Sequence, residues 1–246
     1  MGPFAVIGYP VSDSMSPALF RAAYPQFPKD TYRYIETTCC TTALEQMKAL
    51  GILAANITAP LKTDCITYAQ TVSAKVRQIG AANLLVREND TWSAMNTDVF
   101  GVLESFRANG IQLKGQHALV IGAGGAGRAA AWVLEASGAR VYVVNRTLHK
   151  THLYALEEIP QWLPRCALVV NTVPAALDNR LFRNLTGYHT VLDASYKTAP
   201  LQEAALRSKS LYLNGYHWLY HQGVVSFRTM TGLEPDTTSM RRLLGL

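Results

Sequence analysis

The sequence predicts an α/β fold with two lobes and a cleft between them, and two observations support this. Short apolar runs such as residues 4–7 alternate along the chain with helix-like stretches such as residues 42–47. From His117 the alternation sharpens into an apolar strand, a glycine-rich turn, an alanine-rich helix through Ser137 and a second strand at residues 140–144. Strands that alternate with helices are typical of α/β domains, in which helices cover a mostly parallel sheet.

The same patterns divide the chain into two domains. We expect residues 1–98 to form one domain and residues 99–216 the other, in which apolar runs at residues 168–170 and 190–192 extend a parallel sheet. The tail, residues 217–246, has apolar residues at helical spacing and is expected to complete the first domain. No proline- or serine-rich linker separates the halves, so short connections must cross the boundary.

Composition argues against several classes of function. The 246 residues carry a formal net charge of +6, but the lysines and arginines are scattered, which disfavours nucleic acid and favours small anionic ligands. The four cysteines form no C-x-x-C pair, so neither a disulfide framework nor a metal site is expected. No segment has the pattern of a secretory signal or a membrane span. We therefore expect a cytoplasmic protein that binds a small molecule and has no metal, membrane or nucleic-acid partner.

A glycine-rich turn predicts where a dinucleotide binds. Residues 122–127, Gly-Ala-Gly-Gly-Ala-Gly, fit the pattern G-x-G-x-x-G between an apolar strand at residues 118–121 and a helix expected to begin near Arg128. Glycines permit the tight turn and let backbone N–H groups approach a pyrophosphate, which rests at the positive end of the helix. This pattern indicates a Rossmann-like dinucleotide-binding domain. Its predicted cofactor contacts are Gly122, Gly124, Gly125, Ala126 and Gly127.

The end of the following strand favours NADP over NAD. An NAD enzyme normally offers Asp or Glu there to the ribose hydroxyls, but this chain has Asn145, Arg146 and Thr147, with Lys150 shortly after. A guanidinium can stack on adenine and form a forked hydrogen bond to a 2′-phosphate, which a carboxylate would repel. The alternative interpretation is a solvated arginine at a strand end. We expect NADP as the cofactor, with these four residues among its contacts.

Two serines after the first strand can hold a carboxylate. Ser14 and Ser16 lie two residues apart in the turn that follows the apolar run at residues 4–7. The alternative interpretation is a helix cap, with Pro17 at the first position of the helix. Taken alone, the local pattern favours the cap.

Three further segments resemble, in order and spacing, those of shikimate dehydrogenases. They are residues 56–62 (Asn-Ile-Thr-Ala-Pro-Leu-Lys), residues 81–83 (Ala-Ala-Asn) and residues 96–101 (Asn-Thr-Asp-Val-Phe-Gly). Later motifs are also similar to that family, namely Asn171-Thr172, Asp193-Ala194-Ser195-Tyr196 and Gly215-x-x-x-Leu219-x-x-Gln222. With the glycine-rich turn, the resemblance covers nearly the whole chain.

The resemblance implies an activity and a set of site residues. The activity is the reversible reduction of 3-dehydroshikimate to shikimate by hydride transfer from NADPH, a step of chorismate and aromatic amino-acid biosynthesis, carried out by a monomer or homodimer. The implied substrate contacts are Ser14 and Ser16 at the carboxylate, with Thr58, Asn83, Asp98 and Gln222 on the hydroxyls and Tyr196 nearby. Lys62 and Asp98 become the catalytic pair, and Thr172 and Gly215 join the cofactor contacts.

The chemistry of the reaction suits this pair. Hydride delivery to a ketone leaves an alkoxide that needs a proton, and an ammonium within hydrogen-bond reach supplies charge and proton together. Lys62 fits that task, and Asp98 can accept hydrogen bonds from Lys62 and from a ring hydroxyl. Whether Lys62 donates directly or a relay through Asp98 moves the proton stays open. Without the other segments, Lys62 would be a solvated helix start and Asp98 an ordinary helix cap.

The chain departs from the family pattern at a few positions. Asp13 stands where His is usual, and Leu84 and Val173 stand where Thr or Ser is common. Trp218 occupies the place of a Met that commonly packs near the nicotinamide, so we expect a nicotinamide pocket of different shape. The alternatives are quinate or an aminated shikimate as substrate, a methylenetetrahydrofolate dehydrogenase, and an NADP-binding sensor without turnover.

Overall fold

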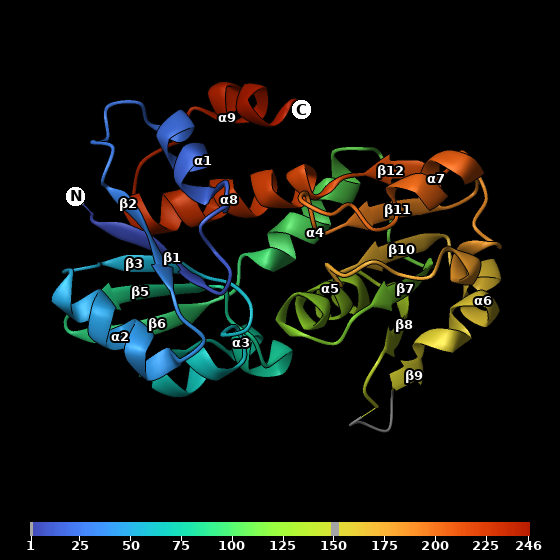
Figure 1. Cartoon of the computed structure of the whole chain (residues 1–246), viewed down its shortest axis with the longest axis horizontal. Helices are drawn as coiled ribbons and strands as arrows, with labels where there is room; N and C mark the ends of the chain where they lie inside the picture. Colours follow the sequence, from blue (N-terminus) through green and yellow to red (C-terminus); the bar gives the residue numbers. More distant parts are fainter. Residues whose placement is uncertain (1, 149–152) are drawn as a thin grey trace. The chain divides into compact units, whose positions relative to one another are not determined.

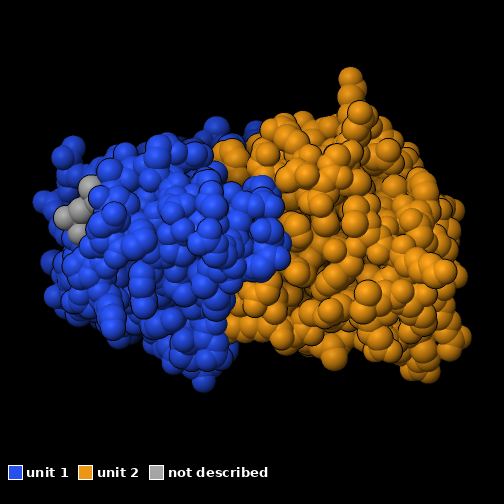
Figure 2. Space-filling model, turned by 90° about the horizontal axis from the view of Figure 1, so that it is seen from above, with its two compact units in different colours: residues 1–97, 220–246 blue, residues 98–219 orange. Residues whose placement is uncertain are grey.

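The computed structural model describes residues 2–148 and 153–246. The chain forms two compact units, the first made of residues 1–97 and 220–246 and the second of residues 98–219 (Figure 2). The assignment of substrate binding to the first unit and of NADP binding to the second stays a proposal.

The first unit is built on a six-stranded sheet with the strand order β2-β1-β3-β5-β6-β4. Its strands are β1 (Phe4–Gly8), β2 (Tyr32–Glu36), β3 (Ala54–Ile57), β4 (Thr71–Val72), β5 (Leu84–Glu88) and β6 (Thr91–Met95). Strand β1 is parallel to both β2 and β3, as alternating strands and helices predict. Strand β5 runs antiparallel to β3 and to β6, so this sheet is mixed.

The hairpin between β5 and β6 is a feature that the apolar runs did not predict, and its cause is local. Its two-residue turn consists of Asn89 and Asp90, whose φ angles are 46° and 64°. Two consecutive positive φ angles are typical of a type I′ turn, whose twist matches that of paired strands, and Asn and Asp tolerate this conformation. The turn returns the end of β6 to the edge of the sheet where β5 begins, with Met95 opposite Leu84.

Helices cover this sheet through apolar side chains. They are α1 (Ser16–Ala23), α2 (Cys40–Ala49) and α3 (Ala74–Ile79), with the 3₁₀ helix η1 (Asp64–Tyr68), while α9 (Thr237–Leu244) packs against α1. The core between α2 and the sheet contains the fully buried Met47 and Ile52. Residues 220–246, which include α9, belong to the first unit (Figure 1).

The second unit confirms the predicted Rossmann-like domain. Its sheet has the strand order β12-β11-β10-β7-β8-β9, and all neighbouring strands are parallel. The strands are β7 (His117–Ile121), β8 (Arg140–Asn145), β9 (Leu153–Ala155), β10 (Leu168–Asn171), β11 (Thr190–Asp193) and β12 (Leu211–Leu213). Its main helices are α4 (Asp98–Arg107), α5 (Gly125–Ala136), α6 (Ile159–Trp162) and α7 (Gln202–Ser208). Helix α8 (Gly215–Thr231) begins in this unit and ends in the first.

Helix α5 begins at Gly125, earlier than the expected start near Arg128. Gly124 is its N-cap residue, and Gly127 lies in its first turn. Position 127 requires glycine, because a Cβ atom there would lie 2.0 Å from the carbonyl oxygen of Gly122. Glycine therefore lets the first turn of α5 approach the end of β7.

Candidate functional site

Five predicted residues lie at one edge of the first unit's sheet. Strands β1 and β3 are parallel neighbours, so the loops that follow them leave the same edge. The loop after β1 carries Ser14 and leads to Ser16, the first residue of α1, and the loop after β3 carries Thr58 and Lys62. Because β5 is antiparallel to β3, Asn83, which precedes β5, lies at this edge as well. Carboxyl ends of parallel strands are the usual place for ligand sites in α/β folds.

The serine pair does not cap helix α1, which contradicts the helix-cap interpretation. The N-cap residue is Met15, which forms no side-chain cap, and Ser16 is already the first helical residue. The Ser14 hydroxyl instead accepts a hydrogen bond from the Ser16 backbone N–H at 3.3 Å and donates to Ser16 Oγ at 3.2 Å. Two adjacent hydroxyls can both donate to a single carboxylate. The contact with the substrate carboxylate stays a proposal.

A carboxylate that sequence inspection missed holds the serine loop. Glu36, the last residue of β2, accepts hydrogen bonds on Oε1 from the backbone N–H groups of Val11 and Ser12, both at 2.9 Å. These bonds, from Val11 first and Ser12 second, hold the pKa of Glu36 below its usual value. No pattern could reveal this contact, because the partners are backbone groups 25 and 24 residues away.

Lys62 lies in a turn at residues 59–63. The 3₁₀ helix η1 begins only at Asp64. The Lys62 carbonyl accepts a hydrogen bond from the Ala82 N–H at 2.8 Å and another from the Cys65 thiol at 3.6 Å. Within the same segment, the Leu61 N–H donates to the Thr58 carbonyl and the Cys65 N–H donates to the Leu61 carbonyl, both at 3.0 Å. The segment before β5 thus holds the Lys62 backbone in place.

Hydrogen bonds join the segments around Asn83 and Thr97. Asn83 Oδ1 accepts the Thr97 backbone N–H at 2.6 Å, and Asn83 Nδ2 donates to Thr97 Oγ1 at 2.9 Å. Both residues are only 3% exposed. In the same way, Asn96 Nδ2 donates to the Ala81 carbonyl at 2.9 Å. Asn83 therefore has a structural role besides the proposed substrate contact, for which its amide carries a second N–H.

A buried polar network extends from this pair through residues that sequence inspection missed. Ser226 Oγ lies 2.9 Å from Thr97 Oγ1 and accepts a hydrogen bond from Asn56 Nδ2 at 3.1 Å. Asn56 Oδ1 accepts the hydroxyl proton of Tyr32 at 2.7 Å. Burial raises the pKa of Tyr32 well above its usual value, so this hydroxyl stays a donor. One signal could have revealed Ser226, because it follows Gln222 by one helical turn among apolar residues.

The predicted substrate residue Gln222 belongs to this network. Gln222 Oε1 accepts hydrogen bonds from Thr97 Oγ1 at 3.3 Å and from Ser226 Oγ at 3.4 Å. Residues four apart on a helix share a face, which places Gln222 and Ser226 side by side on α8. The structure thus connects Gln222 to Asn83 through Thr97.

The glycine-rich turn of the second unit has the geometry that a pyrophosphate requires. Gly122 has φ +102°, a left-handed conformation that favours glycine, and its N–H donates to the Val144 carbonyl at 2.8 Å. Residues 124–126 form the start of α5, and a Cβ atom at Gly124 would meet nothing within 4 Å. An anion can therefore approach the backbone N–H groups of this helix end. Arg128, which sequence inspection had not assigned to the site, donates from Nε to the carbonyl of this turn at Ala123, at 3.2 Å.

The residues after β8 lie beside this turn. Asn145 Oδ1 accepts the Ala123 N–H at 3.3 Å, and its Nδ2 donates to the Thr147 carbonyl at 2.9 Å. Asn145 thus connects the two segments that are predicted to contact the cofactor. Arg146 and Thr147 are exposed, and Lys150 lies outside the described residues.

The remaining predicted contacts follow neighbouring strands of the second sheet. The Thr172 hydroxyl donates to the Ile121 carbonyl at 2.8 Å, at the end of β7. Gly215 begins α8, and a Cβ atom there would lie 2.5 Å from the backbone nitrogen of Tyr196. The Tyr196 ring stacks on that of Tyr216, with 5.2 Å between the centroids. Close packing explains Gly215, and its contact with the cofactor stays a prediction.

The predicted catalytic carboxylate has a partner that the sequence did not reveal. Asp98 is the first residue of α4, and its Oδ1 accepts the indole N–H of Trp218 at 3.0 Å. Asp98 is 3% exposed and Trp218 is 4% exposed. Sequence comparison marked Trp218 only as a departure from the family pattern, whereas the structure places it in direct contact with Asp98.

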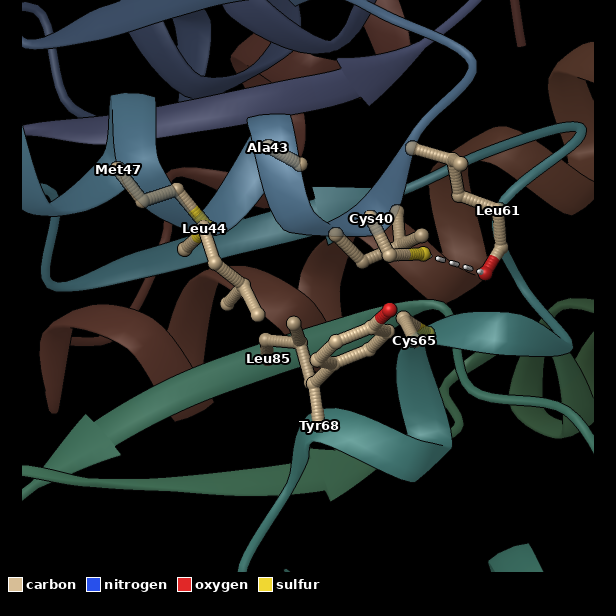
Figure 3. A pocket seen from close by; sticks show the side chains of 9 residues that line it. Cys40, Ala43, Leu44, Met47, Leu61, Cys65, Tyr68 and Leu85 are labelled. Carbon is tan, nitrogen blue, oxygen red and sulfur yellow. Dashed lines mark hydrogen bonds between the residues drawn. The ribbon is translucent and has the colours of Figure 1, made fainter.

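An apolar pocket in the first unit does not suit the implied substrate (Figure 3). Its cavity volume is about 10 Å³, roughly the space that a single water molecule needs. Burial raises the pKa of Cys40 to about 11 and that of Cys65 to about 12, so both thiols stay protonated. A carboxylate would lose its hydration there with few polar groups to replace it. The lining residues are Cys40, Ala43, Leu44, Met47, Ile57, Leu61, Cys65, Tyr68 and Leu85.

Two further features concern metals and membranes. Within residues 2–148 and 153–246, no three His, Cys, Asp or Glu side chains are grouped so that they could hold a metal ion. In the same part of the chain, no helix combines the length and apolar composition needed to cross a membrane.

Comparison with known proteins identifies the family. A family model described as the shikimate dehydrogenase substrate binding domain matches residues 6–85. The shikimate dehydrogenase (NADP(+)) of Thermus thermophilus is 34% identical over 263 residues, which cover 99% of each chain. This chain belongs to the shikimate dehydrogenase family. The methylenetetrahydrofolate dehydrogenase alternative is thereby excluded.

Solved structures of shikimate dehydrogenases have the same fold. The crystal structure from Aquifex aeolicus has a TM-score of 0.86 at 28% identity and covers 98% of this chain and 97% of its own. The structure from Thermus thermophilus in complex with NADP(H) and shikimate has a TM-score of 0.84 at 30% identity and covers 100% and 99%. A second family model, the NAD binding domain of D-isomer specific 2-hydroxyacid dehydrogenases, matches residues 55–185. That model describes a cofactor domain only, so the full-length relatives decide the family.

We expect Ser226→Ala to lower the free energy of unfolding by about 1–3 kcal/mol, because it leaves the buried Asn56 amide and Thr97 hydroxyl short of a partner. Urea denaturation measures this loss. Thr229→Ala is the control, since the Thr229 hydroxyl donates within its own helix, to the Val225 carbonyl at 2.8 Å. An equal denaturation midpoint for Ser226→Ala and the unmodified protein would contradict the role of the network.

Proposed function

We propose that this protein interconverts shikimate and 3-dehydroshikimate with NADP(H). One observation carries the proposal: the loop with Ser14 and Ser16 and the turn with Lys62 leave the same edge of one sheet. The serines offer a site for a carboxylate, and Lys62 offers a proton donor. The chain is also similar over nearly its full length to NADP-dependent shikimate dehydrogenases. A substrate with a carboxylate at one end of a ring and a carbonyl at another needs this pair of groups.

The other polar residues hold the ring hydroxyls. Amide and hydroxyl side chains can both donate and accept, so they match hydroxyl groups whose protons rotate. The buried hydrogen-bond network around Thr97 holds the amides of Asn83 and Gln222 in place. This reduces the conformational entropy lost when the substrate binds. The proposed ring contacts are Thr58, Asn83, Asp98 and Gln222, with Tyr196 nearby.

Lys62 carries the proton transfer. NADPH, when bound, supplies the hydride that the carbonyl carbon receives. The carbonyl oxygen gains negative charge as this happens, and the Lys62 ammonium gives it a proton, which leaves a hydroxyl and a neutral amine. In the oxidation direction the amine takes the proton back. Asp98 accepts hydrogen bonds from Lys62 and the substrate, and so keeps the lysine in position.

The second unit holds the cofactor. The N-terminal end of α5 carries partial positive charge and unpaired N–H groups, which suit a pyrophosphate. Arg146, exposed at the end of β8, suits the 2′-phosphate that distinguishes NADP from NAD. The remaining proposed contacts are Gly122, Gly124, Gly125, Ala126, Gly127, Asn145, Thr147, Lys150, Thr172 and Gly215.

A spectrophotometric assay tests the proposed function. Purified protein is mixed with shikimate or quinate, each with NADP or NAD, and the absorbance of the reduced cofactor is followed. We expect the largest kcat/KM for shikimate with NADP. A larger value with quinate would shift the substrate, and no turnover with any pair would favour the NADP-binding sensor.

Two further proposals concern the state of the protein in the cell. We propose that the protein is located in the cytoplasm, which the free thiols of Cys39, Cys40, Cys65 and Cys166 support. We also propose that the protein is a monomer or a homodimer and that it does not bind nucleic acid.

We expect Arg146→Ala to weaken NADP binding by about 10–100-fold and NAD binding far less, because a hydrogen bond to a charged group contributes about 1.5–3 kcal/mol. Titration of both cofactors followed by tryptophan fluorescence measures the two dissociation constants. Arg140→Ala is the control, since Arg140 is exposed at the opposite end of the same strand. Equal losses for NADP and NAD would refute the assignment of Arg146.

We expect Lys62→Ala to lower kcat by about 10²–10⁴-fold, the usual contribution of a positioned acid or base, with little effect on NADP affinity. Asp98→Asn should resemble it, and the double variant should lose less than the product of the two, because the residues act as one unit. Steady-state kinetics and thermal melts check this, with Lys48→Ala, an exposed lysine of α2, as control. Normal turnover by folded Lys62→Ala would exclude the mechanism.

A further inference from the structure

Two buried side chains of the second unit meet at the start of helix α4. The Trp218 indole donates to Asp98 Oδ1 at 3.0 Å, and both residues are at least nine-tenths buried. They come from different helices, since Asp98 is the first residue of α4 and Trp218 lies in the first turn of α8. A buried hydrogen bond to a carboxylate is among the stronger ones in proteins.

A gap in helix α4 admits the indole. Gly101 follows Asp98 by three residues and therefore lies on the same face of α4. A Cβ atom at Gly101 would lie 2.5 Å from Trp218 Cδ1 and 2.8 Å from Trp218 Nε1. Glycine is less favourable than alanine inside a helix. Close approach of the indole gives a reason for glycine at this position.

The chemistry of an indole suits a partner of a reacting carboxylate. An indole N–H donates and cannot accept, so Asp98 Oδ1 is held as an acceptor. The indole is neutral, so it leaves the negative charge of Asp98 available to a lysine ammonium and a substrate hydroxyl. A bond to one oxygen also restricts rotation of the carboxylate, and small misplacements of catalytic groups reduce rates strongly.

We propose that Trp218 is a positioning residue for the reaction and that it acts through the carboxylate of Asp98. The absence of a side chain at Gly101 leaves the space that the indole occupies. The inference rests on the proposed function of Asp98. It differs from a purely structural role for Trp218 as a buried ring, because the hydrogen bond rather than the ring carries the effect.

The first test removes the N–H and keeps an aromatic ring. We expect Trp218→Phe to lower kcat for shikimate by about 10–100-fold, the loss of one hydrogen bond to a charged group. Replacement of Trp218 by 3-benzothienylalanine, which keeps the bicyclic shape and replaces the N–H by sulfur, should give the same loss. Thermal melts identify any variant that fails to fold, and the benzothienyl variant then decides the result.

The second test asks whether the effect passes through Asp98. Introduced into Asp98→Asn, the change Trp218→Phe should lower kcat by no more than about twofold further, because coupled residues are not additive. Gly101→Ala, which displaces the indole without altering it, should also lower kcat. If Trp218 had only a structural role, the losses of kcat in Trp218→Phe and Asp98→Asn would be independent and would multiply in the double variant.

A matched control is available at another tryptophan of the same unit. The indole N–H of Trp162 is buried without a hydrogen-bond partner among the described residues, and its ring stacks on Tyr142 with 4.2 Å between the centroids. Trp162→Phe therefore removes a tryptophan without removing a hydrogen bond, and we expect kcat within about twofold of normal.

The outcomes separate this inference from the proposed function. If the unmodified protein does not turn over shikimate, the proposed function fails and this inference fails with it. If the unmodified protein is active and Asp98→Asn is impaired, normal kcat in folded Trp218→Phe and in the benzothienyl variant overturns the inference alone. Losses of Trp218→Phe and Asp98→Asn that multiply in the double variant also overturn it.

Discussion

The hydrogen bonds between the Asn83 amide and Thr97 join two strand ends on which most of the candidate site depends. Asn83 precedes β5 and Thr97 follows β6, so the pair closes the open end of the hairpin. Thr97 also contacts Gln222 and Ser226 of helix α8. An unmet buried donor or acceptor costs about 1–3 kcal/mol, so these segments cannot shift independently. Asp98 follows Thr97 directly, so the bonds that hold Thr97 also hold the backbone at the start of helix α4.

At the edge of the first sheet that carries Ser14 and Lys62, distant groups hold the short loops in place. Glu36 accepts two backbone N–H groups of the serine loop, and the Lys62 carbonyl accepts the N–H of Ala82. Loops whose backbone groups are hydrogen-bonded in this way need little reorganisation when a ligand binds, which favours both affinity and catalysis. The proposed chemistry therefore rests on a preformed set of side chains on a rigid sheet.

A buried carboxylate has a comparable function in the second unit. Asp193, at the end of β11, accepts hydrogen bonds from Asn171 Nδ2 at 2.7 Å, the Leu201 N–H at 3.0 Å and the Tyr212 hydroxyl at 3.1 Å. Burial raises the pKa of Asp193, and these bonds offset part of that effect. Asp193 links the ends of neighbouring strands next to the predicted contact Tyr196. The motif at residues 193–196 thus contains one structural and one proposed functional residue.

The amino-acid sequence by itself determined the α/β class, the Rossmann-like domain and the glycine-rich turn, because periodicity and glycine patterns record local backbone requirements. Motif spacing likewise indicated the family and Asp98. Only the tertiary structure decided that Lys62 lies in a turn, that the serines do not cap α1, and that Trp218 contacts Asp98. The contacts of Lys62 with Ala82 and of Trp218 with Asp98 join groups far apart in the sequence. The energies of all these contacts depend on burial and on hydrogen-bond geometry, which are properties of the folded chain rather than of any local pattern.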